Sequence, residues 1–142
     1  MPITPTTGLL KLVIDEMAVQ LATITGMNVY KWPIRRPAKY PCCIISDQPA
    51  VKMTEYRPTA PTGVYHIYIH TLVTQRKDQL AYEELEKYIS RDSVSSIKEV
   101  MQLVTVAGLD DVLVSATGPR RKYPDLGRNV WGFTNEVLVT QT

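Results

Sequence analysis

The sequence predicts a single α+β domain in which helices pack on a mostly antiparallel sheet. Three observations predict it: an amphipathic helical stretch opens the chain, several short strand patterns follow, and a second helical region precedes two closing strands. Hairpin connections dominate this order and no β-α-β crossover is clearly required, which favours antiparallel pairing. The 142 residues suit one domain, and 44% apolar residues with 21% charged residues are typical of a folded soluble protein.

An N-terminal helix is predicted over residues 7–25. Its apolar residues recur at steps of one, three and four, which is the spacing of an amphipathic helix. Thr6 or Thr7 can cap its start, and Gly26 lies where a helix would end. The apolar positions are Leu9, Leu10, Val13, Met17, Leu21 and Ile24.

Three strands are predicted in the next part of the chain, over residues 28–32, 40–46 and 51–56. Prolines exclude regular structure from residues 33–41, and residues 57–63 are predicted to form the loop of a hairpin. Adjacent Cys42 and Cys43 would point to opposite faces of a strand, so they cannot form a two-thiolate metal pair without distortion. We interpret them as two small apolar residues of a buried strand.

The clearest strand covers residues 64–74. Bulky side chains alternate on both of its faces, which predicts a central strand covered on both sides. His66 and His70 share a face of this strand but lie roughly 13 Å apart, too far to bind one metal ion.

The C-terminal half is predicted to hold a helix over residues 78–90, strands over 112–117 and 129–140, and a long loop over 118–128. Ser93 can cap a further helical segment that ends near Gly108. The apolar side of the first helix comprises Leu80, Ala81, Leu85, Tyr88 and Ile89. One face of the last strand holds Trp131, Phe133, Val137 and Val139, interrupted by Asn135.

No catalytic constellation is apparent in the sequence. Asp15–Glu16 and Asp110–Asp111 are neighbours in sequence, and we interpret them as a helix surface and as a loop before a strand. There is no Gly-rich phosphate loop, cofactor motif or metal-ligand spacing. Residues 1–25 do not resemble a signal peptide, and no apolar run is long enough to span a membrane. The sequence therefore predicts a structural subunit, synthesised in a cytoplasm, that assembles with other proteins.

Basic residues concentrate in two predicted loops. Such clusters suit an electrostatic partner surface, although solvated loop charge explains them equally well. Tyr123 beside the second cluster also allows contact with nucleic acid through phosphate binding and base stacking. The clusters are Lys31, Arg35, Arg36 and Lys39, and Arg120, Arg121, Lys122 and Arg128.

The chain resembles the tail terminator (tail-completion) proteins of long-tailed bacteriophages, in particular those of actinobacteriophages. The first likeness is the amphipathic helix that leads through a Pro-rich stretch to the strand at residues 41–46. The second is the strand at residues 64–71 followed by a helix and then by residues 88–97. That segment is similar to the family's Y-x-S-x-x-G-x-x-S-[IV] pattern, with Ser93 or Val94 where glycine is commoner. The third is the closing strand at residues 130–139.

The resemblance implies an α+β subunit that forms a ring, expected to be hexameric, on the head-proximal end of the tail tube. Such a ring ends tube polymerisation and offers a docking face to the head connector, or stopper. It also implies a virion location after assembly in the host cytoplasm. The implied partners are further copies of the chain, the tail tube protein and the connector. DNA would pass through the lumen without sequence-specific binding, and neither a cofactor nor a membrane is involved.

The basic clusters become candidate docking residues under this resemblance. Arg120, Arg121, Lys122 and Arg128 would dock on the neighbouring subunit or on an acidic rim of a partner ring. The loop with Arg35, Arg36 and Lys39 would face another partner or the lumen. Alternatives are another neck component such as a connector or stopper, a small nucleic-acid-binding module and, last, an enzyme of unrecognised type.

Overall fold

The computed structural model describes residues 9–31, 37, 39–46, 64–90, 96–104, 109–114, 120–124, 126–127 and 129–141. The helices are α1 (Leu9–Leu21), α2 (Asp78–Ile89) and α3 (Ile97–Met101). The strands are β1 (Asn28–Lys31), β2 (Cys42–Ser46), β3 (Val64–Thr74), β4 (Leu109–Val114), β5 (Arg121–Lys122) and β6 (Val130–Gln141). The protein is therefore of the α+β class, as the sequence predicts.

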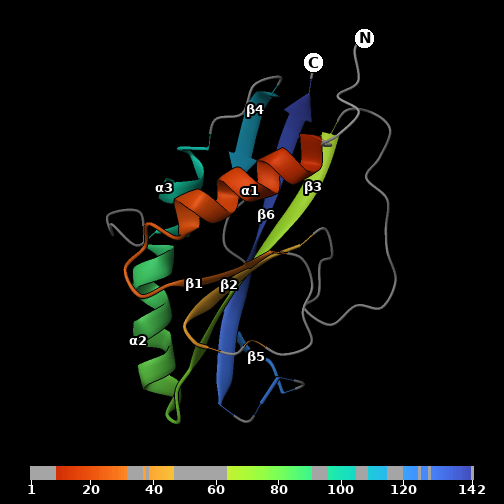
Figure 1. The fold of residues 1–142 in the computed structure, drawn as a ribbon. Coiled ribbons are helices and arrows are strands. Elements are labelled where there is room, and N and C mark those ends of the chain that lie inside the picture. Colours follow the sequence, from red (N-terminus) through yellow and green to blue (C-terminus); the bar gives the residue numbers. More distant parts are fainter. Residues whose placement is uncertain are drawn as a thin grey trace.

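All six described strands belong to one sheet. Its order is β1-β2-β3-β6-β4, and β5 pairs with the beginning of β6 (Figure 1). Only the β1–β2 pair is parallel among the described pairs; the others are antiparallel. The long β3–β6 ladder, from Val64↔Thr140 to Thr74↔Val130, forms the centre of the sheet.

Two connections differ from the expected hairpins. The first joins β1 to β2, which are parallel, and the second joins β3 to β4. Strands β3 and β4 are both antiparallel to β6, so they run in the same direction on either side of it. The chain travels between them through α2 and α3, which makes this a crossover with a third strand inserted. The prediction that no crossover is required was wrong, because hydropathy patterns do not show which strands are neighbours in space.

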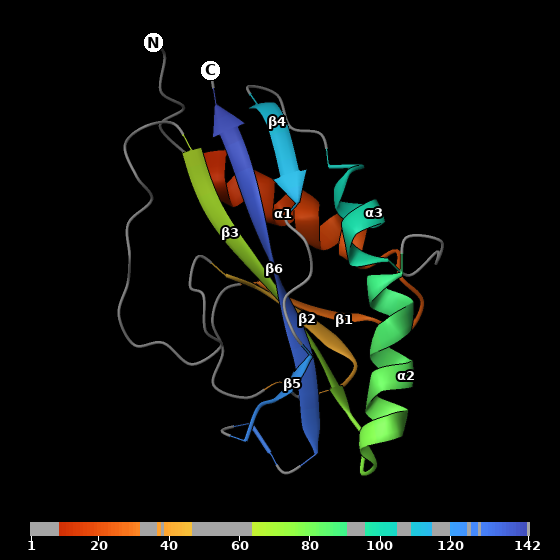
Figure 2. The same cartoon turned by 180° about the vertical axis from the view of Figure 1, so that it is seen from behind.

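The three helices cover one face of the sheet (Figures 1 and 2). Apolar residues from each helix meet those of β2, β3 and β6 in one buried cluster, which gives the helices their main support. The predicted inward face of β6 is confirmed, since Trp131, Phe133, Val137 and Val139 all belong to this cluster and Asn135 is buried between them. Phe133 belongs to this cluster and has no exposed surface.

A smaller apolar cluster lies on the opposite face of the sheet. It contains Cys42, Ile44, Leu72, Leu126 and Val130, with Tyr30, Tyr40 and Tyr123 packed against it. Cys43 belongs instead to the helix-side cluster, so the prediction that the two cysteines point to opposite faces is confirmed. Burial raises the pKa of both thiols to about 12, which keeps them protonated and unreactive at neutral pH.

Strand β3 has the predicted bounds and the predicted central position. Its cover on the second face is partial, because His70 and Leu72 are buried whereas His66 is exposed. Helix α1 ends at Leu21, earlier than predicted, and turns lead from there to Gly26. Gly26 has a φ of 78°, a left-handed conformation that glycine adopts without steric cost.

Helices α2 and α3 differ in detail from the prediction. Leu80 was placed on the apolar side of α2 but is 46% exposed, whereas Ala81, Leu85 and Tyr88 are buried. The N-cap of α3 is Ser96, whose hydroxyl accepts a hydrogen bond from the backbone N–H of Glu99. Ser93, the predicted cap, lies outside the described residues.

Two further predictions were wrong. Asp110 and Asp111 were assigned to a loop, but β4 begins at Leu109 and contains both, with a register irregularity between Leu109 and Asp111. The predicted loop over residues 118–128 contains β5. The predicted strand over 51–56, the loop over 57–63 and the caps Thr6 and Thr7 lie outside the described residues.

Candidate docking surface

The second basic cluster gathers around β5 at the beginning of β6, at the opposite end of β6 from β4 (Figure 1). Arg120, Arg121 and Lys122 are all exposed there. Arg128, Arg35 and Arg36 lie outside the described residues.

Pairing with β6 divides these cations between the two faces of the sheet. Lys122 is opposite Trp131 and Arg121 is opposite Gly132. Opposed residues of an antiparallel pair point to the same face. Because Trp131 belongs to the helix-side core, Lys122 lies on that face and Arg121 lies on the other.

On the helix side, cations and aromatic rings form a connected cluster. The Lys122 Nζ lies 4.9 Å from the centroid of the Trp131 ring, and the Arg120 Cζ lies 5.0 Å from that of Tyr82. The two rings meet edge to face, with centroids 5.7 Å apart. Arg120 also donates to Glu86 Oε2 over 3.3 Å. Each cation–π contact contributes about 0.5–1 kcal/mol at an exposed site. Together these contacts stabilise the packing of β5 and Arg120 against α2 and β6.

On the other face, Arg121 lies over Tyr123 with 5.2 Å between its Cζ and the ring centroid. The Arg121 Nε is 3.5 Å from the Tyr123 hydroxyl, which is 3.3 Å from the Thr134 hydroxyl. Thr134 in turn lies 2.9 Å from His70 Nδ1. A chain of polar contacts therefore links Arg121 to a buried residue of the central strand.

Gly132 is required for this arrangement because β3 and Tyr123 approach its backbone closely. A Cβ at this position would overlap the Thr71 carbonyl oxygen, and it would lie 2.6 Å from Leu72 Cδ2 and 3.0 Å from Tyr123 Cε2. Only a residue without a side chain lets Tyr123 fold over β6 at this point.

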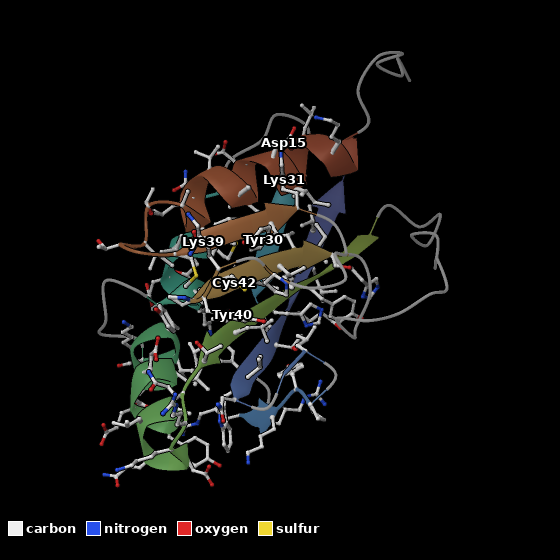
Figure 3. The ribbon with its side chains drawn as sticks, turned by 60° about the horizontal axis from the view of Figure 1, so that its bottom comes forward. Asp15, Tyr30, Lys31, Lys39, Tyr40 and Cys42 are labelled. Atoms are coloured by element: carbon white, nitrogen blue, oxygen red, sulfur yellow. The ribbon has the colours of Figure 1, made fainter. Side chains whose placement is uncertain are left out.

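The described members of the first basic cluster, Lys31 and Lys39, lie elsewhere, on or beside β1. The backbone N–H of Lys39 donates to the Tyr30 hydroxyl of β1 over 3.1 Å, and Figure 3 shows the two residues close together. Four strand spacings, roughly 19 Å, separate β1 from β5. The structure therefore does not bring Lys39 together with Arg120, Arg121 and Lys122.

An ion-pair group that the sequence did not predict joins α1 to β1. Asp15 lies 2.7 Å from Lys11 Nζ and 3.0 Å from Lys31 Nζ, and Figure 3 shows it beside Lys31. The hydrogen bond from Lys11, followed by that from Lys31, lowers the pKa of Asp15 below its ordinary value of 3.8. Lys31 therefore shares one carboxylate with Lys11, and the three side chains together keep one positive charge.

The substitution Asp15→Asn should lower the stability of the protein at pH 7. The folded-state pKa is depressed, so the contribution of Asp15 is present above its unfolded-state pKa and is lost as the pH falls through the folded-state value. The effect should be small because the pair is exposed to solvent. Thermal melts of both proteins from pH 7 to pH 2 test this. A difference that persists unchanged at pH 2 would contradict an electrostatic origin.

The two histidines have separate partners. His66 Nδ1 lies 3.7 Å from Glu136 Oε1, whereas His70 contacts Thr134. Within the described ranges, no group of three or more His, Cys, Asp or Glu residues is placed to hold a metal ion.

None of the described helices is long and apolar enough to cross a membrane. No known protein family matches the chain, and no curated protein matches its sequence. The geometry around β5 and β1 is therefore the basis for a functional proposal.

Proposed function

We propose that the chain is a structural subunit of a phage tail terminator, which forms a ring that caps the tail tube and receives the head connector. The observation that carries the proposal is that two chemically different surfaces lie toward opposite edges of one sheet. One comprises β1 with Asp15, Lys31 and Lys39, and the other comprises β5 with its cations and aromatic rings.

A closed ring requires such a difference. In a ring, each subunit places one surface against a different surface of its neighbour, whereas a two-fold dimer uses one surface twice. The edge strands β1 and β4 and the projecting β5 are suitable material for these contacts, because sheet edges pair readily with other chains. The order of helical and strand segments along the sequence, which resembles that of tail terminators, further supports this proposal.

Another neck component, such as a connector or stopper, would use the same kind of contacts. Such a protein differs in its place in the particle more than in its chemistry. Labelling of the chain in assembled virions separates the two, since a terminator lies directly on the last layer of the tail tube.

Native mass spectrometry of the purified chain across a concentration series tests the ring. We expect the subunit number to rise to one closed species, a hexamer, and to stop there. A two-fold dimer that adds no further subunits at the highest concentration would contradict the heterologous contact on which the ring depends.

A further inference from the structure

The three cations around β5 differ in whether a carboxylate neutralises them. Arg120 is paired with Glu86. Within the part of the chain that the structure describes, Arg121 and Lys122 contact aromatic rings but no carboxylate. Both side chains are exposed. Among the described residues, this end of the sheet therefore presents two positive charges that no carboxylate contacts.

Both unpaired cations are held in place by rigid neighbours. Lys122 lies over Trp131, which is only 6% exposed and forms part of the core. Arg121 lies over Tyr123, whose hydroxyl is close to Thr134 of β6. A long side chain that is already ordered loses less conformational entropy when a partner binds. These contacts therefore reduce the entropy that both side chains would lose when a partner binds.

An exposed aromatic ring completes the surface. Tyr82 on α2 is 45% exposed, although its ring touches both Arg120 and the Trp131 ring. Tyrosine, tryptophan and arginine are the residues that most often dominate the energy of protein–protein interfaces. Their combination at one end of the sheet is typical of a protein-binding surface.

We propose that Arg121 and Lys122 bind carboxylates of an acidic protein segment that crosses strand β5, while Tyr82 supplies an apolar contact. The Arg120–Glu86 pair is an example, within the chain, of a carboxylate bound at this surface. The inference rests on the proposed function only for the source of the segment, which would be the tail tube protein or the connector.

A protein segment fits this surface better than nucleic acid does. Single-stranded nucleic acid binds by stacking bases on open aromatic faces. Here a cation already lies over one face of each aromatic ring, namely those of Tyr82, Tyr123 and Trp131. The edge-to-face contact between Tyr82 and Trp131 covers a further part of these two rings.

Fluorescence anisotropy tests the proposal with a labelled oligoglutamate peptide and a single-stranded oligothymidylate of equal charge. The double variant Arg121→Gln/Lys122→Gln should bind the peptide about tenfold more weakly than the unmodified chain. The matched control is Lys77→Gln/Lys98→Gln, which removes the same net charge from the start of α2 and from α3 and should change affinity less than about twofold. Circular dichroism establishes that each variant is folded.

Three results would overturn the proposal. The first is an equal loss of affinity in the control, which indicates net charge alone. The second is oligothymidylate binding that exceeds peptide binding and is lost in the double variant, which indicates a nucleic-acid surface. The third is no peptide binding even at low salt. None of these results depends on whether native mass spectrometry detects a ring. Failure of this inference and failure of the proposed function are therefore distinguishable.

Discussion

Reversing the charge of both residues of β5, in the double variant Arg121→Glu/Lys122→Glu, should abolish incorporation of the chain into phage particles. Like charges brought together at an interface cost several kcal/mol, so affinity for an acidic partner should fall by at least about 100-fold. Immunoblotting of particles purified from cells that supply the variant as the only copy measures the loss. Particles with the normal amount of the variant would contradict a docking role for β5.

The choice of Arg121 and Lys122 follows from the structure. The sequence favours Arg120 equally, but Arg120 contacts Glu86 and Tyr82 within its own chain. The substitution Arg120→Glu would place a second carboxylate beside Glu86, so a loss of function could reflect local damage. The control Lys77→Glu/Lys98→Glu has the same net charge as the double variant and changes neither proposed contact surface, so it should be incorporated normally.

Replacing Gly132 with alanine should destabilise the fold by about 3 kcal/mol, a large effect for the addition of one methyl group. The new Cβ would overlap the Thr71 carbonyl oxygen of the neighbouring strand and crowd Leu72 and Tyr123. Because the Thr71 oxygen belongs to the backbone of the central strand, it cannot move aside as a flexible side chain would. Thermal unfolding should show a fall in the midpoint temperature of about 10 °C.

Gly26→Ala is the matched control for this prediction. A Cβ at Gly26 has open space around it, so the cost should be about 1 kcal/mol and arise only from the positive φ. If both variants lost equal stability, the close approach of β3 to Gly132 would not be the cause. Loss of stability in Gly132→Ala should also weaken the attachment of Tyr123, and with it the placement of Arg121.

The sequence predicted those elements whose pattern depends on one strand or one helix alone. Strand β3 has its predicted bounds because its eleven residues alternate with the period of two that is specific to a strand. The opposite orientations of Cys42 and Cys43 follow from the same rule. The helix side of β6 was also predicted, since its apolar residues recur with period two on either side of Asn135.

The errors arise where partners from distant parts of the chain decide the structure. Strand β5 has only two residues, both charged, and lies between Pro119 and Pro124 in the sequence. It forms a strand because it pairs with β6, and its own sequence pattern does not predict this. Asp110 and Asp111 are poor strand formers, but the ladder with β6 includes this segment. The parallel β1–β2 pair likewise cannot be inferred from hydropathy.

The candidate site was only half predicted. The basic residues of β5 and the neighbouring Tyr123 were identified from the sequence, but Tyr82 and Trp131 were not recognised as aromatic partners. Tyr82 and Trp131 are brought together by α2 and β6, which are distant in sequence. One signal was present, since Tyr82 stands next to glutamates and outside the predicted apolar side of α2. An aromatic residue in that position indicates a contact that the helix pattern alone does not explain.

Electron microscopy of tail tube protein polymerising with and without the purified chain tests the central claim most directly. If the chain is a terminator, tubes should stop lengthening once it is added, and a ring of its subunits should be visible at one end only. Tubes that keep the same length distribution and have bare ends in the presence of excess chain would contradict the proposed function.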